Sequence, residues 1–145
     1  MKKILLFLLL SIFCFSDNTL LKGINWGDSQ EDIINKQGKP SKINKKKEEM
    51  KYYNLKLENI NLDEVNFQLK DNKLVSWSAG TKVDKKEAYD CIDILKENSN
   101  LKLLKKLLSG GEYYKGVTEE RTVVFMVTIQ AFGRRSLSME FNKPE

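Results

Sequence analysis

The stretch VNFQLKDNKLVSWSA, residues 65–79, decides the fold that we expect for this chain. Apolar and polar side chains alternate on both sides of its centre, with the period of two that is typical of a half-buried β-strand. The apolar positions are Val65, Phe67 and Leu69 in the first half and Val75, Trp77 and Ala79 in the second. Between them, Asp71-Asn72-Lys73 is a turn sequence, because Asp and Asn tolerate turn conformations. The stretch predicts an antiparallel hairpin with one apolar face and one wet face.

Other alternating segments predict further strands. Tyr53, Leu55 and Leu57 precede the hairpin and complete a three-stranded meander. Near the C-terminal end, residues 123–129 are rich in β-branched and apolar residues and residues 137–141 alternate again, with Gly133 and Arg134 at the turn between them. The lysine-rich segment before the meander and the polar segment before residue 123 are expected to be loops.

Two pairs of the capping-box kind mark the starts of helices, because each places an acceptor side chain at the N-cap and a carboxylate three residues later. The pairs are Asp28 with Glu31 and Asp84 with Glu87. The first helix is expected to end at Gly38 after about three turns. The second is expected to reach about Asn98, and a short third helix is expected over Leu101–Leu108, with its leucines packed on the sheet.

The order of helix and strands, followed again by helix and strands, predicts two related halves. The caps Asp28 and Asp84 and the phenylalanines Phe67 and Phe125 recur at nearly the same spacing, which favours a degenerate duplication over about residues 23–80 and 81–142. We therefore expect residues 17–145 to form one α+β domain. In this prediction an antiparallel sheet has helices packed on one face.

The first sixteen residues, MKKILLFLLLSIFCFS, have the pattern of a signal peptide, because two lysines precede an apolar run from Ile4 to Phe13. That run of about ten residues is too short to span a bilayer as a helix, which takes about twenty. We expect cleavage near Ser16 and a soluble exported protein, periplasmic or extracellular. The alternatives are an uncleaved anchor, a buried first helix, or a lipoprotein acylated on Cys14, where Phe13 stands in place of the small residue expected before the cysteine.

The composition excludes several classes of function. The chain has no histidine, so Ser-His-Asp and Cys-His catalysis are impossible and zinc would have to rely on carboxylates. Removal of residues 1–16 lowers the net charge from +5 to +3, and lysines are interleaved with glutamates, so we expect no nucleic-acid binding. Cys91 shares a predicted helix face with Ala88 and Leu95, which favours core packing over a reactive thiol. We expect no cofactor, no metal site and no enzymatic activity.

Five residues in the first half have the spacing G-x-[ST]-x-x-x-[VI]-x-x-x-x-G-x-P, namely Gly27, Ser29, Ile33, Gly38 and Pro40. This segment resembles the BamE (SmpA/OmlA) family of envelope proteins and the domains that share the fold of β-lactamase inhibitor protein, over roughly residues 23–79. The resemblance implies a tandem helix-plus-strands fold and a noncatalytic binding or assembly role in the cell envelope. The matched residues are structural, so the resemblance assigns no binding residue.

Four residues are candidate contacts for a partner, which we expect to be another envelope or extracellular protein. Tyr113 and Tyr114 lie in an expected glycine-rich loop, where tyrosines can present rigid amphipathic surface. Arg134 and Arg135 lie at an expected hairpin tip and could bind a carboxylate or phosphate, although most such charges are merely solvated.

Two other functions stay open at this point. The basic segment Leu101–Leu108 could lie on an anionic membrane as an amphipathic helix, giving a weak membrane-surface contact. An exported hydrolase could use the carboxylates of Asp84, Glu87, Glu119 and Glu120 for acid-base work. The first two of these acids are also predicted helix caps, and the other two lie in an expected polar loop.

Overall fold

A computed structural model describes residues 19–131 and 134–145 of the chain. Residues 1–18, with the predicted signal peptide and Cys14, and residues 132–133, with the predicted turn at Gly133, lie outside the described residues. In chain order the elements are α2 (Gln30–Gln37), β1 (Lys42–Asn44), β2 (Glu49–Leu57), β3 (Ile60–Lys70), β4 (Lys73–Val83), α3 (Lys85–Asn98), β5 (Lys102–Lys106), β6 (Glu112–Val117), β7 (Val123–Ala131) and β8 (Arg134–Asn142).

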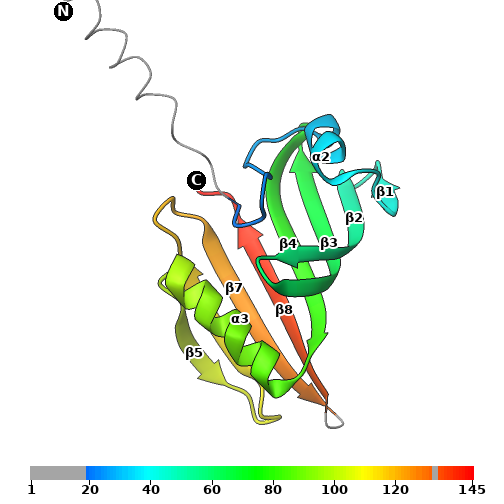
Figure 1. Ribbon diagram of the computed structural model, residues 1–145. Coiled ribbons are helices and arrows are strands. Elements are labelled where there is room, and N and C mark those ends of the chain that lie inside the picture. The colour runs from blue at the N-terminus through cyan, green and yellow to red at the C-terminus, as the bar shows by residue number, and fades with distance from the viewer. Residues whose placement is uncertain (1–18, 132–133) are drawn as a thin grey trace, which may run out of the picture.

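The strands form one antiparallel sheet in the order β1-β2-β3-β4-β8-β7-β6-β5. In the described residues the order of elements occurs twice, since α2 precedes the meander β1–β4 and α3 precedes the meander β5–β8. The last strands of the two meanders, β4 and β8, pair with each other and join them. Figure 1 shows α3 on one side of the sheet, where it contacts β8 and β4.

The predicted α+β class is wrong. Of the described residues, 50% lie in strands and 18% in helices, a mainly-β fold in which two short helices accompany an eight-stranded sheet. The expected helix over Leu101–Leu108 is the edge strand β5, and the two expected loops contain β1 and β6. Leucine and lysine favour helices when isolated, but pairing with β6 on one side decides the conformation of residues 102–106.

Alternation in the strands separates a buried side of the sheet from an exposed side. On the buried side, Trp77 lies opposite Phe141 across β4 and β8, and their rings stack with centroids 3.9 Å apart and planes 5° apart. The indole N–H of Trp77 donates to the carbonyl oxygen of Thr19 at 2.9 Å. The prediction that Trp77 and Cys91 are core residues is confirmed, because both are buried.

The helix starts agree with the sequence only in part. For α3 the predicted pair is confirmed: Asp84 accepts from the N–H of Glu87, and the carboxylate of Glu87 accepts in return from the N–H of Asp84. For α2 the N-cap is Ser29, which forms a capping box with Asp32. Asp28, the predicted cap, instead accepts from the N–H of Asn25 and forms an ion pair with Lys36. Adjacent residues with short acceptor side chains compete for the N-cap position, so the predicted N-cap lies one residue before the observed one.

The turn between β3 and β4 is the predicted Asp71-Asn72 turn. Both residues have positive φ, of 52° and 58°, which short polar side chains tolerate best after glycine. The carboxylate of Glu48 accepts from both of their N–H groups, and the side-chain oxygen of Asn72 accepts from the N–H of Gln30 at the start of α2. The turn therefore also fixes the entry of the first helix.

A search of the described helices finds none that is both long and apolar enough to cross a membrane.

Gly116 in β6 provides a test of this arrangement. A Cβ at this position would come within 2.8 Å of the Ser99 hydroxyl oxygen and 2.9 Å of the Leu101 Cα, whereas a Cβ at Gly80 in β4 would meet nothing within 4 Å. We expect Gly116→Ala to lower the free energy of unfolding in urea by about 1–3 kcal/mol through overpacking. Gly80→Ala is the matched control and should change it by less than about 0.5 kcal/mol. Equal effects of the two substitutions would contradict the close approach of β6 to residues 99–101.

Candidate functional site

The side of the sheet that faces away from the core, which we call the open face, is a continuous surface across all eight strands. One row of cross-strand neighbours runs along it from β1 to β5: Lys42, Lys51, Asn66, Ser78, Glu140, Phe125, Lys115 and Lys102. All of these side chains are partly or fully exposed. Lysines thus occupy both ends of the row, and its centre holds a serine, Ser78, beside a carboxylate, Glu140.

The middle of the open face is lined by small side chains. These small residues alternate with core residues along the two central strands. They are Ser76, Ser78 and Gly80 on β4 and Ser136 and Ser138 on β8. Larger rings flank this floor on either side, with Tyr53 on β2 and Tyr113 stacked on Phe125 at a centroid distance of 6.3 Å on β6 and β7. The result is a polar trough between aromatic margins.

Two hollows lie along this trough. One, of about 420 Å³, is lined by residues of β1–β4, including Lys51, Asn66 and Ser78. The other, of about 310 Å³, is lined by residues of β6–β8, including Tyr113 and Glu140. Ser78 and Glu140 are direct cross-strand neighbours, about 5 Å apart at such positions, so the two hollows meet at the pairing of β4 with β8.

Two charged groups of the open face, Lys51 and Glu64, hold each other in their charged forms. Lys51 and Glu64 form an ion pair at 2.7 Å, and Asn66 donates to the same carboxylate oxygen at 3.0 Å. The hydrogen bond to Glu64 raises the pKa of Lys51, and the hydrogen bonds from Lys51 and Asn66 lower the pKa of Glu64. Both shifts favour the charged forms already present at neutral pH, so neither group is prepared as a general acid or base. At the other margin, the Lys115 ammonium lies 5.4 Å from the centre of the Phe125 ring.

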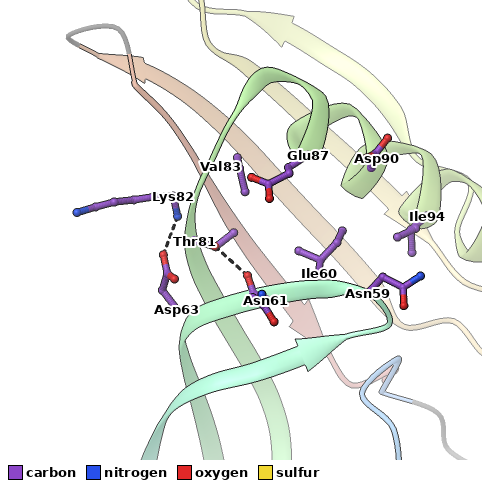
Figure 2. A pocket seen from close by; sticks show the side chains of 10 residues that line it. All are labelled: Asn59, Ile60, Asn61, Asp63, Thr81, Lys82, Val83, Glu87, Asp90 and Ile94. Atoms are coloured by element: carbon purple, nitrogen blue, oxygen red, sulfur yellow. Dashed lines mark hydrogen bonds between the residues drawn. The ribbon is translucent and has the colours of Figure 1, made fainter.

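A second concave feature lies on the opposite side of the sheet, between the tip of the β2–β3 hairpin and α3 (Figure 2). β3 pairs with β2 from residue 60 onward but with β4 only from Glu64 onward, so the tip of the hairpin is free of β4. Two hydrogen bonds hold it nearby: Thr81 donates its hydroxyl to the carbonyl oxygen of Asn61 at 2.9 Å, and the N–H of Lys82 donates to the carboxylate of Asp63 at 2.8 Å.

The cleft, of about 420 Å³, has an apolar floor and an acidic margin. Ile60, Val83 and Ile94 contribute apolar side chains, and Glu87 and Asp90 project from α3 (Figure 2). Glu87 is engaged in the cap of α3, and Asp63 is engaged with Lys82. Two of the three acids that line the cleft, Asp63 and Glu87, therefore hold the hairpin and the helix start, and Asp90 is the third.

The four predicted partner contacts do not come together. Tyr113 lies on the open face. Tyr114, its neighbour in β6, points to the opposite side, where it is buried and donates its hydroxyl to Glu112 at 2.6 Å; burial and this bond raise its pKa. Arg135 also lies on the opposite side, with its guanidinium 5.9 Å from the ring centre of Tyr89 on α3. Arg134 begins β8, and its side chain lies outside the described residues.

The four carboxylates considered for hydrolysis are also separated. Glu119 and Glu120 lead into Val123 at one end of β7, whereas Asp84 directly follows Val83, which pairs with Arg135 near the other end. At about 3.3 Å per strand residue, these ends are roughly 20–25 Å apart. Paired acids of glycosidases lie within about 10 Å of each other, so these four cannot act as one catalytic group.

Residues 19–131 and 134–145 contain neither a metal site nor a reactive thiol. No group of three or more potential ligands among them could hold a metal ion. Burial raises the pKa of the Cys91 thiol to about 12, and its sulfur lies 3.6 Å from that of Met139. Cys91 is therefore a neutral core thiol at physiological pH.

The sequence prediction missed most of the open face, although the pattern was present. Ser76 and Ser78 flank Trp77 on β4, and Ser136, Ser138 and Glu140 alternate with Leu137, Met139 and Phe141 on β8. Attention to the polar half of each alternation, in addition to the apolar half, would have placed these serines together once the two strands were known to pair.

Comparisons with protein-family models, with curated proteins and with solved structures found no match for this chain. The resemblance to BamE and inhibitor-like domains therefore rests on the five spaced residues of the first half, and the function has to be argued from the surfaces themselves.

The hydrogen bond between Asp63 and the N–H of Lys82 yields a test of the hairpin attachment. We expect Asp63→Ala to speed hydrogen exchange at the Lys82 amide by about tenfold, because one charge-assisted hydrogen bond contributes on the order of 1–2 kcal/mol to local protection. Asp90→Ala removes an acid from the same cleft without removing a backbone bond and is the control. Unchanged exchange in Asp63→Ala, or equal acceleration in both variants, would show that the hairpin is held in another way.

Proposed function

We propose that this chain is an exported, noncatalytic protein that binds another protein of the cell envelope or the extracellular space through the open face of its sheet. The observation that carries the proposal is the unbroken cross-strand row from Lys42 to Lys102 with its floor of small residues. The pattern of residues 1–16 supports export, with cleavage near Ser16.

The dimensions of the open face suit a protein partner. Seven strand spacings of about 4.8 Å give a width of roughly 34 Å, and the central strands contribute roughly 20 Å of length. This area of several hundred Å² is comparable with the ~800 Å² that one partner buries in a standard protein interface. A small-molecule site would be expected to be more enclosed and more apolar.

The side chains of the open face also suit such an interface. Small residues on β4 and β8 allow the backbone of a partner to approach, and Tyr53, Tyr113 and Phe125 offer the ring surfaces that dominate binding energy in many interfaces. The lysines at both ends indicate a partner that is acidic at its periphery, because charge complementarity guides association.

Site-specific photocrosslinking tests this proposal. We expect a photoreactive amino acid in place of Ser138, in the centre of the open face, to capture one defined protein in cells that export the chain. The same amino acid in place of Tyr89, exposed on α3 on the other side of the sheet, is the matched control and should capture none. In the purified complex, Tyr113→Ala should weaken binding by about tenfold or more, because truncation of an interface aromatic often costs over 1.4 kcal/mol.

Equal capture from both positions, or capture from position 89 alone, would refute the assignment to the open face. Turnover of a substrate by the purified chain, with no captured protein, would refute the noncatalytic binding role.

A further inference from the structure

The edge strand β5 and the turn that follows it expose an unusual number of leucines. Leu103 is 43% exposed, Leu104 57% and Leu108 111%, which makes Leu108 fully accessible at the turn. These residues form an apolar corner of the sheet, which we call the β5 corner.

The β5 corner is also positively charged. Lys102, Lys105 and Lys106 are exposed on β5, and residues 101–111 contain no acidic residue. Glu112 is the cross-strand neighbour of Lys106 and accepts a hydrogen bond from the Tyr114 hydroxyl at 2.6 Å, so three lysines lie near one carboxylate here. Apolar side chains at a turn surrounded by lysines form a surface that is complementary to an anionic lipid interface, which combines negative headgroups with apolar chains.

The addition of a partner strand along β5 explains these features less well. The register of β5 shifts at Leu104, between Leu103 and Lys105, and a bulge of this kind, like edge lysines, hinders the pairing of a further strand. The most exposed leucine, Leu108, lies beyond the end of β5, where an added strand would leave it uncovered. Two copies of the β5 corner would bring their lysines together, so a symmetric dimer at this position is disfavoured as well.

We propose that the β5 corner contacts an anionic lipid bilayer, with Leu104 and Leu108 entering the interface and Lys102, Lys105 and Lys106 facing the headgroups. This contact uses the edge of the sheet and shares Lys102 with the row on the open face. It requires no helix, because the leucines are presented by a strand edge and a turn.

A polarity-sensitive fluorophore at position 108 tests the proposal in the full chain. The background variant is Cys14→Ser, and Cys91 is buried and protonated, so a Leu108→Cys variant is labelled at one site. The control is the same label on a Lys46→Cys variant, in the lysine-rich turn between β1 and β2 at the opposite edge of the sheet. Because each label reports its own surroundings, the apolar residues 1–16 do not determine the outcome.

With vesicles of phosphatidylcholine containing about one third phosphatidylglycerol, the label at position 108 should shift to the blue and be quenched by lipid-attached quenchers, and the label at position 46 should not. Ionic strength of about 1 M shortens the Debye length to about 3 Å and should weaken the response. Leu104→Ser should raise the lipid concentration needed for half of the response by about tenfold, since one leucine is lost from the interface. Crosslinking from position 138 should be unchanged in Leu104→Ser, which keeps the two proposals distinguishable.

Three results would overturn the proposal. The first is no response at position 108 with anionic vesicles at low salt. The second is an equal response at positions 46 and 108, which would indicate a general attraction of lysines to the vesicles. The third is a response to soluble polyglutamate but not to vesicles, which would assign the β5 corner to an acidic protein.

Discussion

The pairing of β4 with β8 is the interaction on which the rest of the structure depends. It joins two four-stranded meanders into one sheet, and the stack of Trp77 on Phe141 fixes its register from the buried side. A slip of β8 by one residue against β4 would turn Phe141 to the opposite side of the sheet from Trp77. The same register places Ser78 beside Glu140 and Gly80 beside Ser138, so the packing of the core also determines the composition of the open face.

The two sides of the sheet differ in what covers them, and the hairpin β2–β3 contributes to that difference. Residues 60–63 of β3, which precede Glu64, do not pair with β4. The side chains of Asp63 and Thr81 hold this end of the hairpin by hydrogen bonds. Ile60 and Leu62 at this tip are buried, so the curved hairpin and α3 both add apolar cover to the core side. The small residues of β4 and β8 remain accessible on the other side, and this asymmetry is what makes one side a surface for binding.

The sequence predicted the half-buried strands correctly. The prediction was wrong where pairing with a neighbouring strand determines the conformation of the chain. Residues 65–69, 75–79 and 136–141 alternate because one side of each strand meets the core, and residues 123–129 are rich in β-branched and apolar residues, so these strands can be read from the chain alone. The segment from Leu101 to Leu108 has a helical spacing of leucines and residues with high helix propensity, yet it forms an edge strand because β6 is next to it and Gly116 lets residues 99–101 approach. Tyr113 can be identified as a candidate from its residue type. Its separation from Tyr114 and Arg135 follows from the alternation of side chains in a strand, and this segment was expected to be a loop.

The positions of the two proposed surfaces constrain each other. Lys102 and Lys105 on β5 are cross-strand neighbours of Lys115 and Tyr113, so the open face ends at the β5 corner. A bilayer at that corner would lie against the edge of the sheet and leave both of its faces uncovered. A protein held on the open face would then contact β1–β4 and β6–β8 while its periphery lay near the membrane surface. Lys42, at the opposite end of the row, would still face acidic groups of that partner, and Lys102 is the residue of the row that both contacts use.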